Sequence, residues 1–428
     1  MDKVYTFSIH TLGCKVNSYE SNVICEKFEE EGFKRVDFGE PSDVVIINTC
    51  AVTEESARKS RQFARRAKRE NPDCVLVVVG CYSQICDDGS LDFADVVYGS
   101  KNKSEIASTV KQFIENGERI VKVSDMTKPV DFEKMLADRD DRVRATVKIQ
   151  DGCNNFCTYC IIPYARGRIR SKDINEAYDE IKALVFSGYK EIVITGIHLT
   201  SYGLDGKDYG LCDLLERVDK IPGIKRIRLG SLEPKFITEE TVERLSKLTH
   251  LCPHFHLSLQ SGCTETLKRM NRRYTAEEYK HAVDLLKQTF ETVAITTDVI
   301  VGFSGETDEE FEKTCDFVKD IGFSKIHLFP FSPRKGTVAY TMEKVPDNIK
   351  TERMKVIGEI EKDLEENYRS ALIGKTREVL IEKSGREFSV GHTVDYVKVK
   401  VKKPIEINSM VNVIITGTEK DSCIGEMI

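Results

Sequence analysis

Cys153, Cys157 and Cys160, hereafter the loop triad, form a CxxxCxxC motif whose spacing is typical of ligands to an iron–sulfur cluster. Fully protein-held clusters usually take four thiolates, so three cysteines leave one iron of a four-iron cluster open to an exogenous ligand. A zinc knuckle is one alternative, but zinc requires a fourth Cys or His nearby, and the next histidine is His198. A redox CxxC pair would not need the third cysteine. The spacing therefore favours a cluster with one iron available for chemistry.

Three further cysteines, hereafter the sheet triad, each follow a predicted strand and precede a predicted helix: Cys14, Cys50 and Cys81. The carboxyl ends of parallel strands meet at one edge of an α/β sheet, so we expect these thiols to lie together. Helix N-termini at that edge favour anions such as thiolates and an iron–sulfur cluster. The alternative is three unconnected thiols in the hydrophobic core.

The elements that must position these cysteines fall into three folded segments of an α/β chain. Residues 1–120 alternate short apolar runs with helical patterns, which predicts an open α/β sheet domain. Residues 121–141 are polar and indicate a linker. Six strand and helix patterns within 142–370 predict a parallel partial barrel, with a connecting helix over 345–370. Short alternating strands in 371–428 predict a small antiparallel β-barrel.

Two groups of basic residues are candidates for contacts with RNA phosphates. The net charge of −6 argues against a wholly basic nucleic-acid binder but allows local basic patches. The first group, Lys398 and Lys400, alternates along a C-terminal strand, and such alternation is also an ordinary way to protect a sheet edge. The second group forms a basic stripe on the predicted helix after Cys50. The alternative to an RNA contact is that this stripe is simply a solvated helix face. The candidates are Lys398, Lys400, Arg58, Arg61, Arg65 and Lys68.

The sequence carries no signal for export or for crossing a membrane. Its N-terminus lacks a long apolar run behind a basic start, and no later segment approaches the length needed to span a bilayer. We therefore expect a cytoplasmic protein. Disulfides rarely persist in that compartment, so metal ligation or burial must account for the fourteen cysteines.

Taken together, these motifs resemble the radical S-adenosylmethionine (SAM) methylthiotransferases over the whole chain. The resemblance rests on TLGCKVNSYES around Cys14, NTCAVTEESARKSR around Cys50, GCYSQ around Cys81, and CNNFCTYCIIPYARGR from Cys153 onward. It implies an N-terminal cluster domain, a radical SAM barrel and a C-terminal RNA-binding barrel called TRAM. It also implies two [4Fe-4S] clusters, one on the sheet triad that handles sulfur and one on the loop triad that binds SAM.

The activity that this resemblance implies replaces an unactivated C–H bond by C–S–CH3, with SAM used both as methyl donor and as radical source. The sequences of the motifs resemble those of family members that act on N6-threonylcarbamoyladenosine beside the tRNA anticodon. It is less similar to members that act on isopentenyladenosine or on a ribosomal-protein aspartate. The implied partners are tRNA and an electron donor such as a flavodoxin or ferredoxin, whereas the sulfur source is not readable. A non-catalytic RNA-binding protein with structural zinc is the alternative from another class.

The resemblance also suggests residues that hold SAM. Tyr159 resembles the aromatic residue beside the SAM adenine, with loop packing as its alternative. Thr195 and Gly196 end a strand where the backbone approaches the SAM amino group, although a plain turn would also want Gly there. Glu233 and Gln260 lie just past strand ends and are candidates for the SAM ribose or carboxylate.

Two further positions complete the candidate set. Gly302 ends a strand, and its lack of a side chain leaves room for the adenine, although Ser304 stands where the family usually has Pro. Arg166 and Arg168 follow the loop triad. They are candidates for holding a substrate phosphate or the SAM carboxylate, and structural pairing with nearby acids is an equal alternative.

Overall fold

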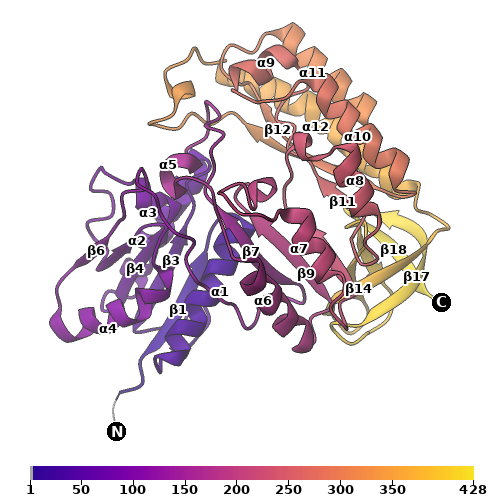
Figure 1. Cartoon of the computed structure of the whole chain (residues 1–428). Coiled ribbons are helices and arrows are strands. Elements are labelled where there is room, and N and C mark those ends of the chain that lie inside the picture. Colours follow the sequence, from indigo (N-terminus) through magenta and orange to yellow (C-terminus); the bar gives the residue numbers. More distant parts are fainter. Residues whose placement is uncertain (1–2) are drawn as a thin grey trace.

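The computed structural model describes residues 3–428 as three folded parts that follow one another along the chain (Figure 1). The N-terminal part lies at one side of the molecule and the C-terminal barrel at the other, with the strands of the central part between them. Within residues 3–428, none of the helices combines the length and the apolar character that crossing a bilayer requires.

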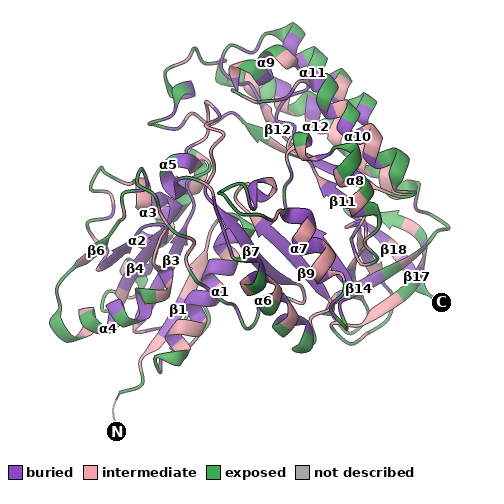
Figure 2. Ribbon diagram, in the orientation of Figure 1, coloured by how far each residue is buried: buried purple, intermediate pink, exposed green. Residues whose placement is uncertain are grey.

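The N-terminal part is a six-stranded parallel sheet in the order β2-β1-β3-β4-β5-β6. The strands are β1 (Thr6–Thr11), β2 (Lys34–Arg35), β3 (Val44–Thr49), β4 (Val75–Gly80), β5 (Val96–Tyr98) and β6 (Ile120–Lys122). Central strand β3 is buried along its whole length, as expected of a strand covered on both faces (Figure 2). The predicted open α/β sheet is confirmed.

Helices cover both faces of this sheet. Their bounds are α1 (Lys15–Glu30), α2 (Glu54–Glu70), α3 (Cys81–Ile85), the 3-10 turn η1 (Lys103–Glu105) and α4 (Ile106–Asn116). Helices α1 and α4 bury apolar side chains against one face, where Ile24 and Val110 meet Ile46. Helix α2 packs on the other face through small residues such as Ala64. The sheet is therefore a rigid base for the three loops that carry Cys14, Cys50 and Cys81.

The polar stretch that the sequence suggested as a linker is packed against the N-terminal part. Residues 123–144 form neither helix nor strand, yet Met135 and Ala137 are buried in a small cluster with Tyr19. The Tyr19 hydroxyl donates to the Met135 carbonyl at 2.8 Å. The Glu26 carboxylate accepts the backbone N–H of Asp138 at 3.0 Å. The segment's polar groups are thus used in specific hydrogen bonds, which composition alone did not indicate.

The central part contains the six predicted strands in sequential order. They are β7 (Ala145–Asp151), β9 (Glu191–Gly196), β10 (Arg226–Leu229), β11 (His254–His256), β12 (Ala294–Val301) and β13 (Lys325–Pro330), and the short β8 (Arg170–Ser171) adds an antiparallel edge to β7. All other neighbours pair in parallel. Between β10 and β11 the sheet continues only through single bridges at Ile227–Leu251 and Leu232–Leu257. The predicted partial barrel is confirmed.

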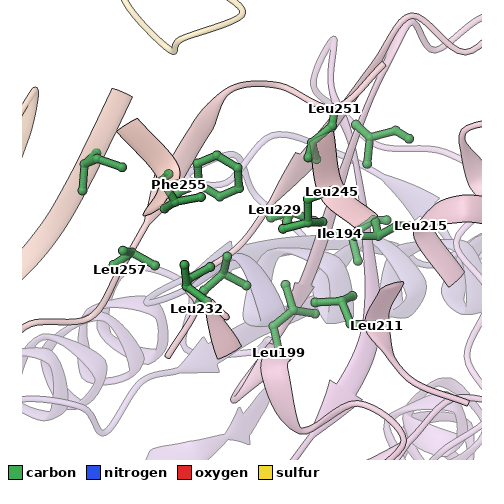
Figure 3. Packing of buried hydrophobic residues seen from close by; sticks show 14 of the residues in the cluster. Ile194, Leu199, Leu211, Leu215, Leu229, Leu232, Leu245, Leu251, Phe255 and Leu257 are labelled. Carbon is green, nitrogen blue, oxygen red and sulfur yellow. The ribbon is translucent and has the colours of Figure 1, made fainter. Parts of the chain in front are cut away.

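The outer layer of the partial barrel is helical. Its elements are α5 (Ile162–Arg166), α6 (Ile174–Phe186), η2 (Leu199–Ser201), α7 (Leu211–Val218), η3 (Pro234–Phe236), α8 (Glu239–Ser246), α9 (Thr264–Arg269), α10 (Ala276–Thr289), α11 (Asp308–Ile321), η4 (Val338–Tyr340) and α12 (Asp347–Ser370). Capping boxes fix the starts of α10 at Thr275 and α11 at Thr307. Ile194 and Leu229 from the strands pack with Leu215 and Leu245 from the helices (Figure 3). This core holds the strand ends in place.

The C-terminal part is a closed five-stranded barrel in the order β14-β15-β16-β18-β17. Its strands are β14 (Thr376–Ser384), β15 (Ser389–Thr393), β16 (Lys398–Val401), β17 (Met410–Glu419) and β18 (Ser422–Met427). The small barrel is confirmed, but β16 and β18 pair in parallel, whereas an antiparallel barrel was expected. Helix α12 joins this part to the partial barrel, in agreement with the predicted helix over 345–370.

Candidate active site

The sheet triad converges on one cavity of about 530 Å³. Cys14 precedes α1, Cys50 follows β3 and Cys81 begins α3, so each thiol lies at the carboxyl end of a strand as expected. Gly13 has φ +102°, and a Cβ there would lie 2.8 Å from the Cys50 sulfur. Only glycine therefore permits this close approach of two of the three loops.

Two thiols of the sheet triad, Cys50 and Cys81, are buried beside the buried cation Arg166, whereas Cys14 is exposed. Burial raises the pKa of Cys81 to about 11, because the protein replaces the water that would solvate a thiolate, and Arg166 opposes that rise. The Arg166 Nε donates to the Cys81 sulfur at 3.1 Å. Burial also raises the pKa of Cys50. These thiols become thiolates when a metal supplies the compensating positive charge.

The loop triad lies in the turn between β7 and α5. Gly152 begins the turn at φ +73°, and a side chain there would collide with the Arg168 carbonyl. The Cys153 backbone N–H donates to Gly167 O at 3.0 Å, and that of Cys160 donates to Cys157 O at 2.9 Å. The turn is therefore held by backbone hydrogen bonds at the start of the motif and within it.

Charged groups from two later loops contact the loop triad: Arg272 lies between α9 and α10, and Glu233 lies just before η3. The Arg272 Nη1 donates to the Cys157 sulfur at 3.3 Å, and its Nη2 pairs with Glu233 at 2.7 Å. Burial raises the pKa of Cys153 to about 11 and that of Cys160 to about 12, and the neighbouring thiols contribute to the rise. Glu233, predicted as a SAM ligand, thus also orients the arginine that contacts a loop-triad sulfur.

The donor set of each triad fits an iron–sulfur cluster better than a zinc ion. Across residues 3–428, no three His, Cys, Asp or Glu side chains gather closely enough to hold a single metal ion. Zinc needs four ligands around one point with Zn–S bonds of ~2.3 Å. A four-iron cluster places each thiolate on a separate iron, so three sulfurs from separate positions suit it.

The other predicted SAM residues fall into two places. Thr195 and Gly196 end β9 and line the same cavity as the sheet triad. Tyr159 lies instead in the loop-triad turn and packs edge-on against Phe303, with ring centroids 6.2 Å apart. Gln260 is buried and adopts φ +69°, a left-handed conformation that is uncommon for a residue other than glycine.

Gly302 lies at the end of β12 with φ +70°. The expected room above it holds the aliphatic part of Lys350 from α12, because an ideal Cβ on Gly302 would collide with that side chain. The open space that the sequence suggested for an adenine is therefore occupied by a lysine stem in this structure.

A buried charge network, which sequence analysis missed, contacts the sheet triad through Arg166 and reaches Asp151, two residues before the loop triad. Arg166 pairs with Glu20 at 2.8 Å and with Asp151 at 3.3 Å. Lys148 lies 2.8 Å from each of the same two carboxylates. The structural alternative therefore holds for Arg166, whereas Arg168 is exposed and stacks over Phe156. The only sequence signal for Glu20 was its place on the apolar face of a predicted helix.

The far wall of the cavity comes from β11, β12 and β13, from the loop after β10, and from the C-terminal barrel. It consists of Gly230, Ser231, His254, His256, Thr296, Asp298, Lys325, His327 and Tyr396. Tyr396 lies between β15 and β16 with φ +67°, and its ring stacks on His392 at 4.9 Å between centroids. The sequence signal was the HFH pattern of β11, and nothing pointed to Tyr396. All three parts of the chain therefore meet at this cavity.

The predicted RNA contacts are mostly engaged in ion pairs. Lys398 pairs with Asp421 at 3.0 Å and Lys400 with Glu419 at 2.8 Å on the barrel surface. Three of the four basic residues of the predicted stripe on α2 form ion pairs: Arg58 pairs with Glu55, Arg61 with Glu54, and Lys68 with Asp95. Arg65 is exposed and lines a surface hollow of about 440 Å³ together with Arg58, Arg61, Arg66 and Arg69.

Comparison with known proteins identifies relatives for nearly the whole chain. Residues 147–318 match the radical SAM superfamily, and residues 6–98 match the uncharacterized protein family UPF0004. The threonylcarbamoyladenosine tRNA methylthiotransferase MtaB of Bacillus subtilis is 42% identical over 407 residues, which are 93% of this chain and 90% of the relative. The corresponding MtaB of Thermotoga maritima is 41% identical over 88% of this chain and 86% of its own.

Other relatives differ in the substrate that their names give. A tRNA-2-methylthio-N(6)-dimethylallyladenosine synthase of Clostridium botulinum is 37% identical over 88% of this chain and 86% of the relative. Among solved structures, the radical SAM methyltransferase TsrM from Kitasatospora setae superimposes with a TM-score of 0.56 at 15% identity, covering 77% of each chain. That likeness concerns the fold alone.

Proposed function

Because this chain belongs to the radical SAM methylthiotransferases, we propose that it converts N6-threonylcarbamoyladenosine beside the tRNA anticodon to its 2-methylthio derivative. One observation carries the choice of substrate. Four relatives named for that nucleoside are 37–42% identical to this chain. Four relatives named for dimethylallyladenosine are 35–37% identical. As a member of a family of enzymes, the chain is not the non-catalytic zinc protein considered above.

The two triads would hold the clusters that this chemistry requires, the loop triad for the cluster that binds SAM and the sheet triad for the auxiliary cluster. The cofactors supply the one-electron chemistry for a C–H bond that acid–base groups cannot deprotonate. Arg272 and Arg166 donate to one sulfur of each triad, so they fix those thiolates and offset their charge. The cavity walls would orient the base and exclude water.

Thr195, Gly196, Glu233, Gln260 and Tyr159 remain the proposed contacts for SAM. The electron donor, for which a flavodoxin or ferredoxin is expected, remains a prediction. For the tRNA backbone we propose the exposed face of α2 that Arg58 and Arg65 occupy, because both side chains are accessible there. The C-terminal barrel would add Lys398 and Lys400 once RNA phosphates compete with their present carboxylate partners.

The proposal is tested by nucleoside mass spectrometry of tRNA from cells lacking this protein. We expect 2-methylthio-N6-threonylcarbamoyladenosine to disappear and its precursor to accumulate, and the wild-type gene to restore the product. Loss of a methylthio-isopentenyladenosine instead would show that the substrate assignment is wrong.

Variants of the triads separate the roles of the two clusters. Replacing the loop triad with Ala is expected to remove about half of the iron and to abolish SAM cleavage, because one of two clusters is lost. Replacing the sheet triad is expected to remove the same fraction while SAM cleavage persists without thiolation. SAM cleavage at the wild-type rate in the loop-triad variant would contradict the assignment.

A further inference from the structure

Lys15 is a cation in the central cavity for which the described structure provides no acidic partner. It begins α1, directly after Cys14, and its side chain is exposed to the cavity. Among residues 3–428, no Asp or Glu side chain lies within ion-pair distance of it, and the permanently charged groups that act on it most strongly are Arg228 and Arg144. A lysine in such surroundings is suited to an anion that arrives from outside.

The other basic side chains at the cavity are already engaged. Arg166 pairs with Glu20 at 2.8 Å, and Lys325 pairs with Glu365 at 3.1 Å. The one carboxylate among the residues that line the cavity belongs to Asp298, and His256 Nε2 lies 3.2 Å from it. Lys15 therefore stands out from the other lining cations because its charge is not already offset.

The surroundings of Lys15 strengthen this positive character. The guanidinium groups of Arg228 and Arg144 lie 4.7 Å and 4.9 Å from the centre of the Tyr396 ring. Their charges are shared with Glu191 and Glu382, and both groups lie beside Tyr396, which lines the cavity. The N-terminus of the 16-residue helix α1 adds a partial positive charge beside Lys15.

We propose that Lys15 binds the carboxylate of the threonyl group on the substrate base and thereby selects the carboxylate-bearing adenosine. This inference rests on the proposed function. The dimethylallyl group is a hydrocarbon and offers nothing to an ammonium group, so its entry would leave Lys15 desolvated without a partner. The same residue thus attracts one modified adenosine and disfavours the other.

The test compares binding of matched anticodon stem-loop RNAs to the cluster-loaded enzyme by fluorescence anisotropy at one salt concentration. One RNA carries N6-threonylcarbamoyladenosine, a second carries the same urea with an alkyl group in place of the carboxylate-bearing portion, and a third carries dimethylallyladenosine. We expect the wild-type enzyme to bind the first RNA at least about 10-fold more tightly than the second, because a hydrogen bond to a charged group contributes a free energy that corresponds to such a ratio. Lys15→Met is expected to remove this preference, and Lys15→Arg to retain most of it.

The preference is a ratio of two affinities measured on the same sample, so partial loss of folded or cluster-loaded protein in Lys15→Met does not alter it. Lys247→Met is the matched control, because it removes the same charge from an exposed position after α8, where Lys247 pairs with Glu243. Its preference is expected to equal that of the wild type.

A preference that survives in Lys15→Met would overturn the inference. The two proposals fail in different ways. If cells lacking the protein lose methylthio-threonylcarbamoyladenosine but Lys15→Met keeps its preference, only the role of Lys15 is wrong. If those cells retain that nucleoside and the wild-type enzyme prefers the dimethylallyl RNA, the proposed function itself is wrong.

Discussion

At the scale of single residues, Arg166 connects most of the chemistry that this chain places together. Its guanidinium contacts the Cys81 sulfur, the carboxylate of Glu20 and the carboxylate of Asp151. It is fully buried, so each of these contacts replaces water that the group would otherwise bind. Its position after the loop triad was readable from the sequence, but its partners were not, because Glu20 and Cys81 come from distant parts of the chain.

Arg166→Ala is expected to lower the free energy of unfolding by about 3 to 5 kcal/mol, because it removes one of the buried cations that Glu20 and Asp151 share and leaves part of their negative charge uncompensated. Anaerobic denaturant titration of the cluster-loaded protein measures this change. Arg168→Ala is the control, since Arg168 is exposed and its guanidinium lies over the face of the Phe156 ring. Equal destabilisation by both substitutions would show that the network contributes little.

At the scale of secondary-structure elements, Glu191 on β9 holds the arginines that dock the C-terminal barrel. Arg228 pairs with Glu191 at 2.6 Å and donates to the Thr393 and Val394 carbonyls at the end of β15. Arg226 also lies near Glu191, at 3.5 Å. Burial by itself raises the pKa of Glu191, but the positive charges of these arginines outweigh it and hold that pKa below its ordinary value.

Glu191→Gln is expected to weaken docking of the barrel by about 3 to 5 kcal/mol near neutral pH, because the buried arginines lose their counter-charge. A carboxylate with a lowered pKa contributes stability that is fully present above its unfolded pKa of ~4.3 and is lost as the pH falls through its folded value. The difference between wild type and variant should therefore be largest above about pH 5 and shrink under acid. Unfolding measured from pH 3 to pH 7 checks this, and a difference independent of pH would contradict it.

The elements themselves were largely predictable from sequence, whereas their contacts were not. The runs around β3, β4 and β9 are apolar enough to identify buried strands, and the order of motifs placed both triads at strand ends. The parallel pairing of β16 with β18 was missed because alternation predicts a strand but not its partner. The cavity wall formed by Tyr396 was missed for the same reason: it depends on how the C-terminal barrel docks.

At the scale of the whole molecule, the surface for RNA is set by which basic side chains are free of partners. Lys398 and Lys400 of the C-terminal barrel pair with carboxylates, while Arg65 and Arg69 are exposed on α2. Net charge alone did not reveal this difference, because it does not say which charges already form pairs.

The double substitution Arg65→Ala and Arg69→Ala is expected to weaken tRNA binding. It should also reduce the magnitude of the slope of log affinity against log salt by about 1 to 2, because each phosphate contact contributes ~0.7–0.9 to that slope. Affinities measured between low and physiological salt give the slope. The matched control is Lys182→Ala with Lys220→Ala, which removes two charges from the partial barrel away from α2. A slope that stays at the wild-type value would place the RNA elsewhere.

The cavity shared by all three parts also has a consequence for the order of synthesis. Cys14, Cys50 and Cys81 lie in the sheet that is translated first, whereas Tyr396 closes the cavity wall from near the other end of the chain. At ~5–20 residues per second, about 20 to 80 seconds pass on the ribosome between Cys14 and Tyr396. During that interval the first domain can fold with its thiols uncovered. The first domain thus has a period in which an auxiliary cluster can be inserted before the last domain completes the cavity wall, and the same period leaves its thiols open to oxidants.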